Sequence, residues 1–553
     1  MWCYYSAHKS NPRLDQIGKG FQAFVTQLEK LQIEYDLGCE NIIRDRGSVE
    51  GKEFIVGQRK YQKVVLPPFM DNIESKTFEL LRNFVKEGGE LIAYSTPTLL
   101  DGSENENLNK FFTNNSQITY AEVKNTDSTY KLLSSDVISF SNISGGGLYH
   151  QRRQFKEGEI LFLVNSSLEQ EAKADITING RSLVEMDAFS GTHYAYPATY
   201  SGKKVTTQVI LPPAGSLLLY VSGEKQKLLP RKQITDTREV VPTTPVEVKR
   251  LKGNALFIDF CDLDIAGKSY ANMHTAEAEQ RYYKAIGEPY NPWRASIQFK
   301  NQTVEREKKD GHATVTYHIN IAKGVDCSLF KLVVEQPQLW KVIVNGIPVN
   351  ATQGEWWLDK SFGVYHAGKA LREGENKVVL DISPTSIFAE IQPIYLTGDF
   401  HLSPAAQGWL IERPEHSLTL GSWKQQGLPF YSRDIAYSQH FNISEPKATY
   451  EIQLTDWDGT VSEVFVNGES AGIIAYQPYK LDVSKWIRKG DNQIEVRVMG
   501  SHRSLLGPHH NKTAQGISGP WHWQKVSGEM PAGEQYILPD YGMNQPFVLR
   551  SGE

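Results

Sequence analysis

The sequence lacks any long hydrophobic run. No apolar stretch in its 553 residues approaches the roughly 20 residues that a membrane-spanning helix needs, so nothing in it predicts a helical membrane protein. The first fifteen residues, MWCYYSAHKSNPRLD, carry neither the charged leader nor the apolar core of an export signal. They also begin without a cap or a strand pattern, and we therefore expect an upstream part of the protein to precede them.

Cysteine is scarce, and charge of neither sign is in large excess. Cys3, Cys39, Cys261 and Cys327 are far apart and show no C-x-x-C spacing, which argues against a zinc site. Buried or free thiols are the commoner outcome for such a set, and a Cys261–Cys327 disulfide is the alternative. A formal net charge of −5 provides no basic field, so nucleic acid is not predicted as a partner. A chain of this length should divide into about three to five domains.

The stretch at 448–501 contains the clearest structural pattern. Tyr450, Ile452 and Leu454 alternate with polar residues, which is typical of a half-buried strand. Asn467-Gly468 follows a Val-rich strand and is the dipeptide that tolerates positive φ at both central positions of a tight hairpin turn. Gly459 lies in a turn that we expect to be more open. Short strands separated by turns, without a long helix between them, predict a β-sandwich.

The order of motifs in this stretch resembles the galactose-binding-like jelly roll, the sugar-binding module of family 2 glycosidases. The resemblance covers about fifty residues. Its motifs are 456–459 (DWDG), 464–468 (VFVNG), Gly472, Tyr479, 481–483 (LDV) and 490–492 (GDN). We expect residues 401–553 to form this domain.

The N-terminal part, residues 1–118, shows an α/β pattern instead. An amphipathic helix is predicted at 14–36, followed by a strand at 63–66, a helix at 75–86 and a strand at 90–94; strand–helix–strand predicts a βαβ unit. The amino-acid sequence of residues 61–97 resembles the amidotransferase-like (flavodoxin-like) domain that follows the catalytic barrel in several glycosidase families. Because 94–97 (YSTP) has no nucleophilic cysteine and no flanking glycines, we interpret the domain as non-catalytic.

The middle of the chain reads as β-structure. Short strands and turns predict a small β-sandwich at 119–223, and the polar, proline-bearing residues 224–249 predict a linker or extended arm. An internal sequence repeat predicts a second jelly-roll-like sandwich at 250–400. The pattern of 342–346 (VIVNG) and 374–380 recurs at 464–468 and 490–496. The predicted fold class is thus multidomain and mainly β, with one α/β domain and three sandwiches.

Two further motifs resemble large rhamnosidase-like glycosidases of family 106. They are 426–431 (QGLPFY) between Trp423 and Tyr437, and Arg503 followed by 506–510 (LGPHH). Together with the α/β domain, the matches follow the expected order over nearly the whole chain. The resemblance implies the C-terminal region of a large glycoside hydrolase, whose full-length form we expect to be periplasmic or extracellular.

Exposed aromatic residues are the main candidates for sugar contact. Trp356, Trp457, Tyr476 and Tyr479 offer flat apolar rings that can stack on pyranose faces. Core or inter-domain packing is the commoner fate of each ring. If adjacent Trp356 and Trp357 lie on a strand, they point to opposite faces, which would leave one exposed.

Histidine and aspartate pairs suggest two further kinds of site. His509 and His510 are candidate sugar contacts, but neighbouring histidines on a strand diverge and serve one metal ion poorly, and packing against Trp521 and Trp523 or a neighbouring domain is the alternative. We therefore predict no metal site and no cofactor. Asp456 and Asp458 could support a structural calcium ion, although turn formation is the commoner explanation for such residues.

A catalytic site is not predicted within this chain. A glycosidase needs two carboxylates about 5 to 9.5 Å apart, normally on a barrel of about 250 residues, whereas the α/β pattern here is confined to residues 1–118. We expect an accessory portion of a bacterial glycoside hydrolase acting in polysaccharide breakdown, partnered by carbohydrate and by a catalytic barrel of the same polypeptide. The alternatives are a stand-alone carbohydrate-binding protein and a scaffold that binds nothing.

Overall fold

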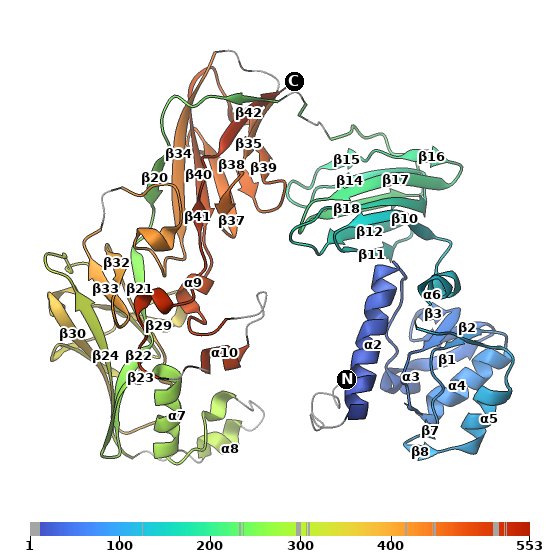
Figure 1. Cartoon of the computed structure of the whole chain (residues 1–553), viewed down its shortest axis with the longest axis horizontal. Helices are drawn as coiled ribbons and strands as arrows, with labels where there is room; N and C mark the ends of the chain where they lie inside the picture. Colours follow the sequence, from blue (N-terminus) through green and yellow to red (C-terminus); the bar gives the residue numbers. More distant parts are fainter. Residues whose placement is uncertain are drawn as a thin grey trace. The chain divides into compact units, whose positions relative to one another are not determined.

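The computed structural model describes residues 12–552, apart from 124, 232–233, 236, 295–299, 306, 308–309, 415–416, 445, 447–448, 513–518, 525 and 527. Cys3 therefore lies outside the described residues. The chain forms two compact units, Met1–Gln233 and Ile234–Glu553 (Figure 1). Within the described part, no helix combines the length and the apolar character needed to cross a membrane.

Unit 1 begins with α/β structure. The strands β4 (Lys63–Leu66), β6 (Glu90–Ala93) and β9 (Ile118–Tyr120) form a parallel sheet, and α4 (Ser75–Lys86) connects the first two. This confirms the predicted βαβ unit. The helix forms because its apolar residues recur at helical spacing and bury one face against the sheet; Leu81 and Phe84 are fully buried.

Other elements of this region were not predicted in detail. The first helix, α2, spans Pro12–Lys30 and is shorter than expected. A three-stranded antiparallel sheet and a small second sheet accompany the parallel one, so three parallel strands alone do not establish the flavodoxin-like assignment. The remaining elements are α3 (Glu40–Arg46), β1 (Gly47–Glu50), β2 (Glu53–Val56), β3 (Arg59–Tyr61), β5 (Asn72–Ile73), β7 (Leu99–Leu100), β8 (Ser103–Glu104), α5 (Glu106–Asn114) and α6 (Thr126–Leu133).

The second half of unit 1 is a small sandwich whose two sheets share one core. Strand β17 alternates strictly between exposed and buried residues, as a sheet with one wet face requires. One sheet has the order β10 (Ile138–Gly145), β13 (Ala172–Asn179), β17 (Lys204–Leu211) and β16 (Thr199–Ser201). The other has the order β11 (Leu148–Gln154), β12 (Gly158–Asn165), β18 (Ser216–Ser222), β14 (Ser182–Met186) and β15 (His193–Ala195).

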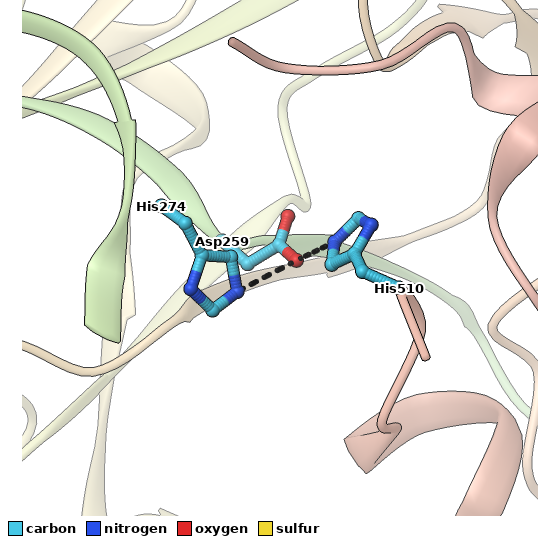
Figure 2. A group of neighbouring side chains, drawn as sticks. All are labelled: Asp259, His274 and His510. Carbon is cyan, nitrogen blue, oxygen red and sulfur yellow. Dashed lines mark hydrogen bonds and ion pairs between the residues drawn. The ribbon is translucent and has the colours of Figure 1, made fainter. Parts of the chain in front are cut away.

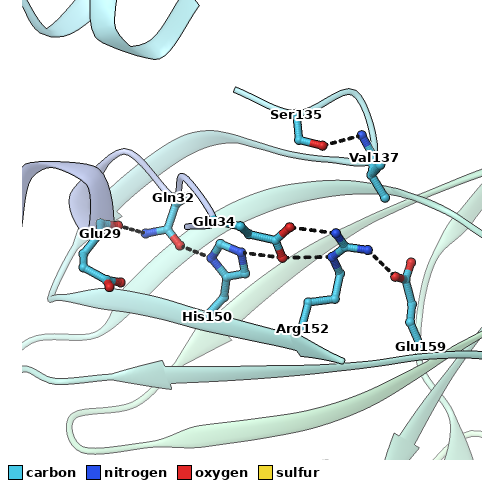
Figure 3. Close-up of polar contacts among 8 residues, drawn as sticks. All are labelled: Glu29, Gln32, Glu34, Ser135, Val137, His150, Arg152 and Glu159. Atoms are coloured by element: carbon cyan, nitrogen blue, oxygen red, sulfur yellow. Dashed lines mark hydrogen bonds and ion pairs between the residues drawn. The ribbon is translucent and has the colours of Figure 1, made fainter. Parts of the chain in front are cut away.

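A polar network joins the segment after α2 to this sandwich (Figure 3). Arg152 on β11 pairs with Glu34 at 2.7 Å and with Glu159 at 2.5 Å. Gln32 contacts His150 Nδ1 at 2.8 Å and donates to the carbonyl of Leu148. Burial alone would raise the pKa of Glu34, but hydrogen bonds from His150 and Arg152 outweigh it and lower that pKa to about 2.

Unit 2 contains two larger sandwiches. The first encloses a core of Val, Ile, Leu, Tyr and Phe side chains between two sheets. One sheet has the order β21 (Asn254–Ile258), β31 (Ile394–Gly398), β25 (Lys331–Glu335), β29 (Asp359–His366) and β28 (Trp356–Trp357). The other has the order β23 (Lys268–His274), β22 (Phe260–Ile265), β24 (Ala313–Ile321), β30 (Gly374–Ile382), β26 (Lys341–Val344) and β27 (Ile347–Val349).

The second sandwich has its own core. One sheet has the order β19 (Arg238–Val240), β42 (Val548–Gly552), β35 (Thr449–Gln453) and β39 (Lys480–Asp482). The other has the order β20 (Glu247–Arg250), β34 (Asp434–Ile443), β40 (Gly490–Met499), β37 (Val461–Val466) and β38 (Glu469–Ile474). The three pairs of sheets confirm a mainly β chain.

The Asn-Gly hairpin is present as predicted. Strands β37 and β38 pair through a turn in which Asn467 and Gly468 have φ values of 54° and 84°. The turn at Gly459 is not open, which corrects our expectation: a Cβ there would lie 2.7 Å from both Trp457 Cζ3 and Val498 Cγ1.

Two of the expected boundaries coincide with regular structure. The stretch predicted as a linker contains β19 and β20, which hydrogen-bond to β42 and β34. Strands β32 (His401–Pro404) and β33 (Trp409–Glu412), assigned from sequence to the last domain, join the sheet of β24 in the first sandwich. Backbone pairing with distant partners therefore determines where these segments belong.

Candidate active-site region around Asp259

Asp259 is the most deeply buried carboxylate of the candidate site. It lies between β21 and β22 and is 1% exposed. Its Oδ2 is 2.6 Å from His510 Nε2 and 3.5 Å from His274 Nε2, and its Oδ1 accepts a hydrogen bond from the Tyr536 hydroxyl at 3.0 Å. Figure 2 shows the two imidazoles approaching this carboxylate from opposite sides.

The partners of Asp259 come from distant parts of unit 2. His274 caps α7 (Thr275–Ala285), where its Nδ1 accepts the backbone N–H of Ala276 at 3.2 Å. His510 follows α9 (Arg503–Leu506), and Tyr536 follows the short helix η6 (Gly533–Gln535). The cluster therefore ties the C-terminal segment to the first sandwich.

The electrostatics favour an ionised Asp259. Burial would raise its pKa, but hydrogen bonds from His274 and His510 outweigh this effect and lower the pKa of Asp259 well below its ordinary value. Burial, together with the Asp259 charge, raises the pKa of Tyr536, which therefore remains a donor. The carboxylate acts as a hydrogen-bond acceptor for three groups.

These residues could also be considered as metal ligands. One ligand atom each from Asp259, His274 and His510 lie within 4.8 Å of one another. However, Nδ1 of His274 accepts a backbone N–H, so its Nε2 carries the proton and has no lone pair for a cation. Metal-bound histidines normally donate their second N–H instead. The donors fit a buried, hydrogen-bonded carboxylate better than a metal ion.

A pocket of about 300 Å³ borders this cluster. Strands β21, β22, β24 and β30 contribute to its lining, and so do the segments around Gln407 and Met530. Asp259 and Tyr536 line the pocket as well, which connects the buried cluster to an accessible space. Ligand pockets typically have volumes of about 300 to 1,000 Å³, so this space is large enough for a small ligand.

Three charged or titratable side chains lie on the strand wall of the pocket. His318 Nε2 is 2.8 Å from Asp262 Oδ2, and its Nδ1 is 3.1 Å from Glu375 Oε1. Asp262 also accepts the backbone N–H of Asn272 at 2.8 Å. Both ring nitrogens of His318 therefore face carboxylate oxygens.

Aromatic rings form the other part of the lining. Trp409 packs edge-to-face on Phe430 and Tyr536, with ring centroids 5.4 and 5.9 Å apart. Its buried Nε1 has no hydrogen-bond partner among the described residues. Polar side chains together with aromatic surface form the lining expected of a site for a ligand with both hydroxyl groups and apolar faces.

The structure separates the aromatic residues predicted from sequence. Trp356 and Tyr476 are 52% and 58% exposed, so their rings are accessible. Trp457 and Tyr479 pack edge-to-face at 5.3 Å against the core of the second sandwich. None of the four lines the pocket near Asp259.

The two adjacent histidines have different environments. His509 is 2% exposed, contacts Phe257 and Phe430, and its Nε2 is 2.9 Å from the Ser504 carbonyl oxygen. Burial lowers its pKa to about 3. This burial favours a packing role, although its aromatic neighbours are not the predicted Trp521 and Trp523. His510 instead contacts Asp259.

The remaining predicted positions have structural contacts. The backbone carbonyl of Asp456 accepts the Asn544 N–H at 2.9 Å, and Asp458 belongs to the two-residue strand β36 (Trp457–Asp458). Cys261 and Cys327 are free and buried, which corrects the alternative of a disulfide between them.

Sequence reasoning did not identify Asp259, His274, Tyr536 or the pocket. His510 was identified, but its acidic partner is 251 positions away. His510 and Tyr536 reach Asp259 because the C-terminal segment packs on the first sandwich, so no local spacing indicates these contacts, and the chain contains 64 acidic residues.

No protein-family model matches the chain. A curated protein of Formosa agariphila, described as "Putative beta-glucuronidase", is 20% identical over 574 residues, which cover 85% of this chain and 47% of that protein. The chain thus spans about half the length of this curated relative.

Solved structures of glycosidases are similar over parts of their length. A rhamnosidase from Novosphingobium sp. PP1Y has a TM-score of 0.47 at 13% identity, covering 93% of this chain and 36% of that one. An alpha-L-rhamnosidase from Streptomyces avermitilis, complexed with L-rhamnose, has a TM-score of 0.22 at 10% identity, covering 72% and 38%. The chain is similar to glycoside hydrolases, as predicted from its sequence.

Proposed function

We propose that this chain is a non-catalytic, carbohydrate-binding portion of a glycoside hydrolase that degrades polysaccharide. The observation that carries the proposal is a pocket lined by polar and aromatic side chains on a β-sandwich, in a chain similar to a protein described as a beta-glucuronidase. Aromatic rings and hydrogen-bonding groups together match the two kinds of surface that a sugar presents.

The acidic groups of the pocket support a binding role. A glycosidase needs one carboxyl group with a raised pKa as general acid and a second carboxylate opposite it. Asp262 and Glu375 both engage His318 and have side chains 33% and 59% exposed. Burial raises the pKa of Glu335, as a general acid would require, but Glu335 does not line the pocket.

The α/β part also supports an accessory role. Its described parallel sheet has three strands, whereas a catalytic barrel requires eight, in about 250 residues. We propose that unit 1 and the sandwiches support such a barrel, with exposed Trp356 and Tyr476 available for further sugar contact.

A glycan panel tests the proposal. Soluble polysaccharides and oligosaccharides are titrated against the purified chain while its tryptophan fluorescence is recorded; ten of the eleven tryptophans lie between residues 293 and 523, so the signal reports unit 2. We expect saturable changes with at least one glycan. A panel without any response would refute carbohydrate binding. If the protein binds glycans in the cell without any attached hydrolase, the alternative of a stand-alone carbohydrate-binding protein would be favoured.

A further inference from the structure

We propose that the pocket beside Asp259 is a binding site for an uncharged pyranose and discriminates against uronic acids. This inference rests on the proposed carbohydrate-binding function and adds both the location and the class of sugar. It assigns the pocket in the first sandwich, rather than the exposed rings of Trp356 and Tyr476, as the specific site.

The dimensions of the pocket suit one sugar ring. Its volume of about 300 Å³ lies at the lower end of the range for small-molecule sites, about 300 to 1,000 Å³. A single pyranose has about a dozen non-hydrogen atoms. At about −0.3 kcal/mol of binding free energy per atom, such a ligand has a dissociation constant on the order of 1 mM. Weak, single-ring recognition is therefore expected.

The polar wall offers groups that recognise hydroxyls. Asp262 Oδ2 and Glu375 Oε1 lie 2.8 and 3.1 Å from the ring nitrogens of His318, and each carboxylate has further lone pairs for sugar O–H donors. Asn320 and Gln407 add amide donors and acceptors to the same lining. Trp409 and Met530, which also line the pocket, supply apolar surface for the C–H face of a ring.

The charge of the lining determines which sugar is accepted. Three carboxylates line the pocket, those of Asp259, Asp262 and Glu375, and no lysine or arginine is among the described residues that do so. His318 already faces two of these carboxylates, so it does not provide a free cation. A uronate would bring a fourth negative charge into a partly desolvated space without a guanidinium partner, which is unfavourable.

A matched ligand pair tests the charge argument. Methyl β-D-glucoside and methyl β-D-glucuronide differ only at C6, and a panel of neutral methyl hexosides and 6-deoxyhexosides covers other ring configurations. Binding is followed by ligand-observed NMR with the full chain. We expect at least one neutral glycoside to bind at least about tenfold more tightly than the glucuronide. Glu375→Gln should narrow this difference. Equal or tighter binding of the glucuronide would overturn the inference.

Matched variants test the location. Trp409→Ala should weaken binding of the neutral glycoside at least about tenfold, and Trp409→Phe, which keeps an aromatic ring and is less disruptive to folding, should weaken it less. Ile347→Ala, an exposed position on β27 of the same sandwich, should leave binding unchanged. If Trp356→Ala abolishes binding and Trp409→Ala does not, the pocket assignment is wrong while carbohydrate binding stands. If no neutral or acidic glycan binds, the proposed function fails with it.

Discussion

The stability of unit 2 should fall between pH 7 and pH 5 because of His509. Burial lowers the pKa of this imidazole to about 3, against about 6.5 in an unfolded chain. Its buried Nδ1 has no partner among the described residues, so a proton there would place a charge without an acceptor. Below pH 6.5 the unfolded state takes up a proton that the folded state does not bind. Stability is therefore full above pH 6.5 and declines as the pH falls toward 3, by about 2 kcal/mol between pH 7 and pH 5.

Urea unfolding of the full chain, monitored by tryptophan fluorescence, measures this decline. The expected loss corresponds to a midpoint shift of about 0.7 to 2 M urea for the usual range of m values. His509→Gln removes the titrating group and should abolish most of the pH dependence in this window, although it lowers stability at pH 7. His312→Gln, with a side chain 58% exposed, is the matched control and should retain the wild-type pH profile. A wild-type profile that is flat from pH 7 to 5, or unchanged by His509→Gln, would refute the reasoning.

Three further perturbations have expected outcomes. Gly468→Val should destabilise unit 2 by about 1 to 3 kcal/mol in urea unfolding, because φ is 84° there and a Cβ meets no atom within 4 Å, so backbone strain is the only cost; a neutral result would contradict the strained-turn argument. Asp259→Ala should lower the free energy of unfolding by about 3 kcal/mol or more, because it leaves buried donors unpaired. Asp262→Asn, at a partly exposed side chain, should lower it by about 1 kcal/mol or less. Equal effects would contradict a stabilising role for the Asp259 cluster. Ionised Glu34 should stabilise unit 1 above about pH 4.3, the pKa of an unperturbed glutamate, and this stabilisation should be lost as the pH falls toward the folded-state pKa of about 2. Acid unfolding followed by circular dichroism should therefore depend less on pH in Glu34→Gln than in the wild type.

Local features of the fold were predictable from the sequence because their causes are local. The helix at 75–86 follows from apolar spacing and the Gly88-Gly89 stop, and its bounds agree with α4. The hairpin at Asn467-Gly468 follows from two residues that tolerate positive φ. Apolar residues at 494, 496 and 498 alternate with polar ones in the sequence, and they form the buried face of β40.

Features that depend on distant partners were not predictable in this way. Residues 247–250 look like a polar linker, yet they form an edge strand because β34 offers free backbone groups. Gly459 appeared to lie in an open turn, but Trp457 and Val498 fill the space above it. The Asp259 cluster joins side chains from three separate regions, so no period or spacing in the sequence indicates it.

The central claim, that this chain binds carbohydrate without cleaving it, is tested most directly by turnover. The purified chain is incubated at high concentration with aryl rhamnosides, galactosides and glucuronides, and release of the aryl group is followed against an enzyme-free control. We expect no release above the control, because cleavage requires two carboxyl groups held in opposed roles in one cleft. Turnover that a single Asp or Glu substitution in this chain abolishes would contradict the account and would identify a catalytic site within it.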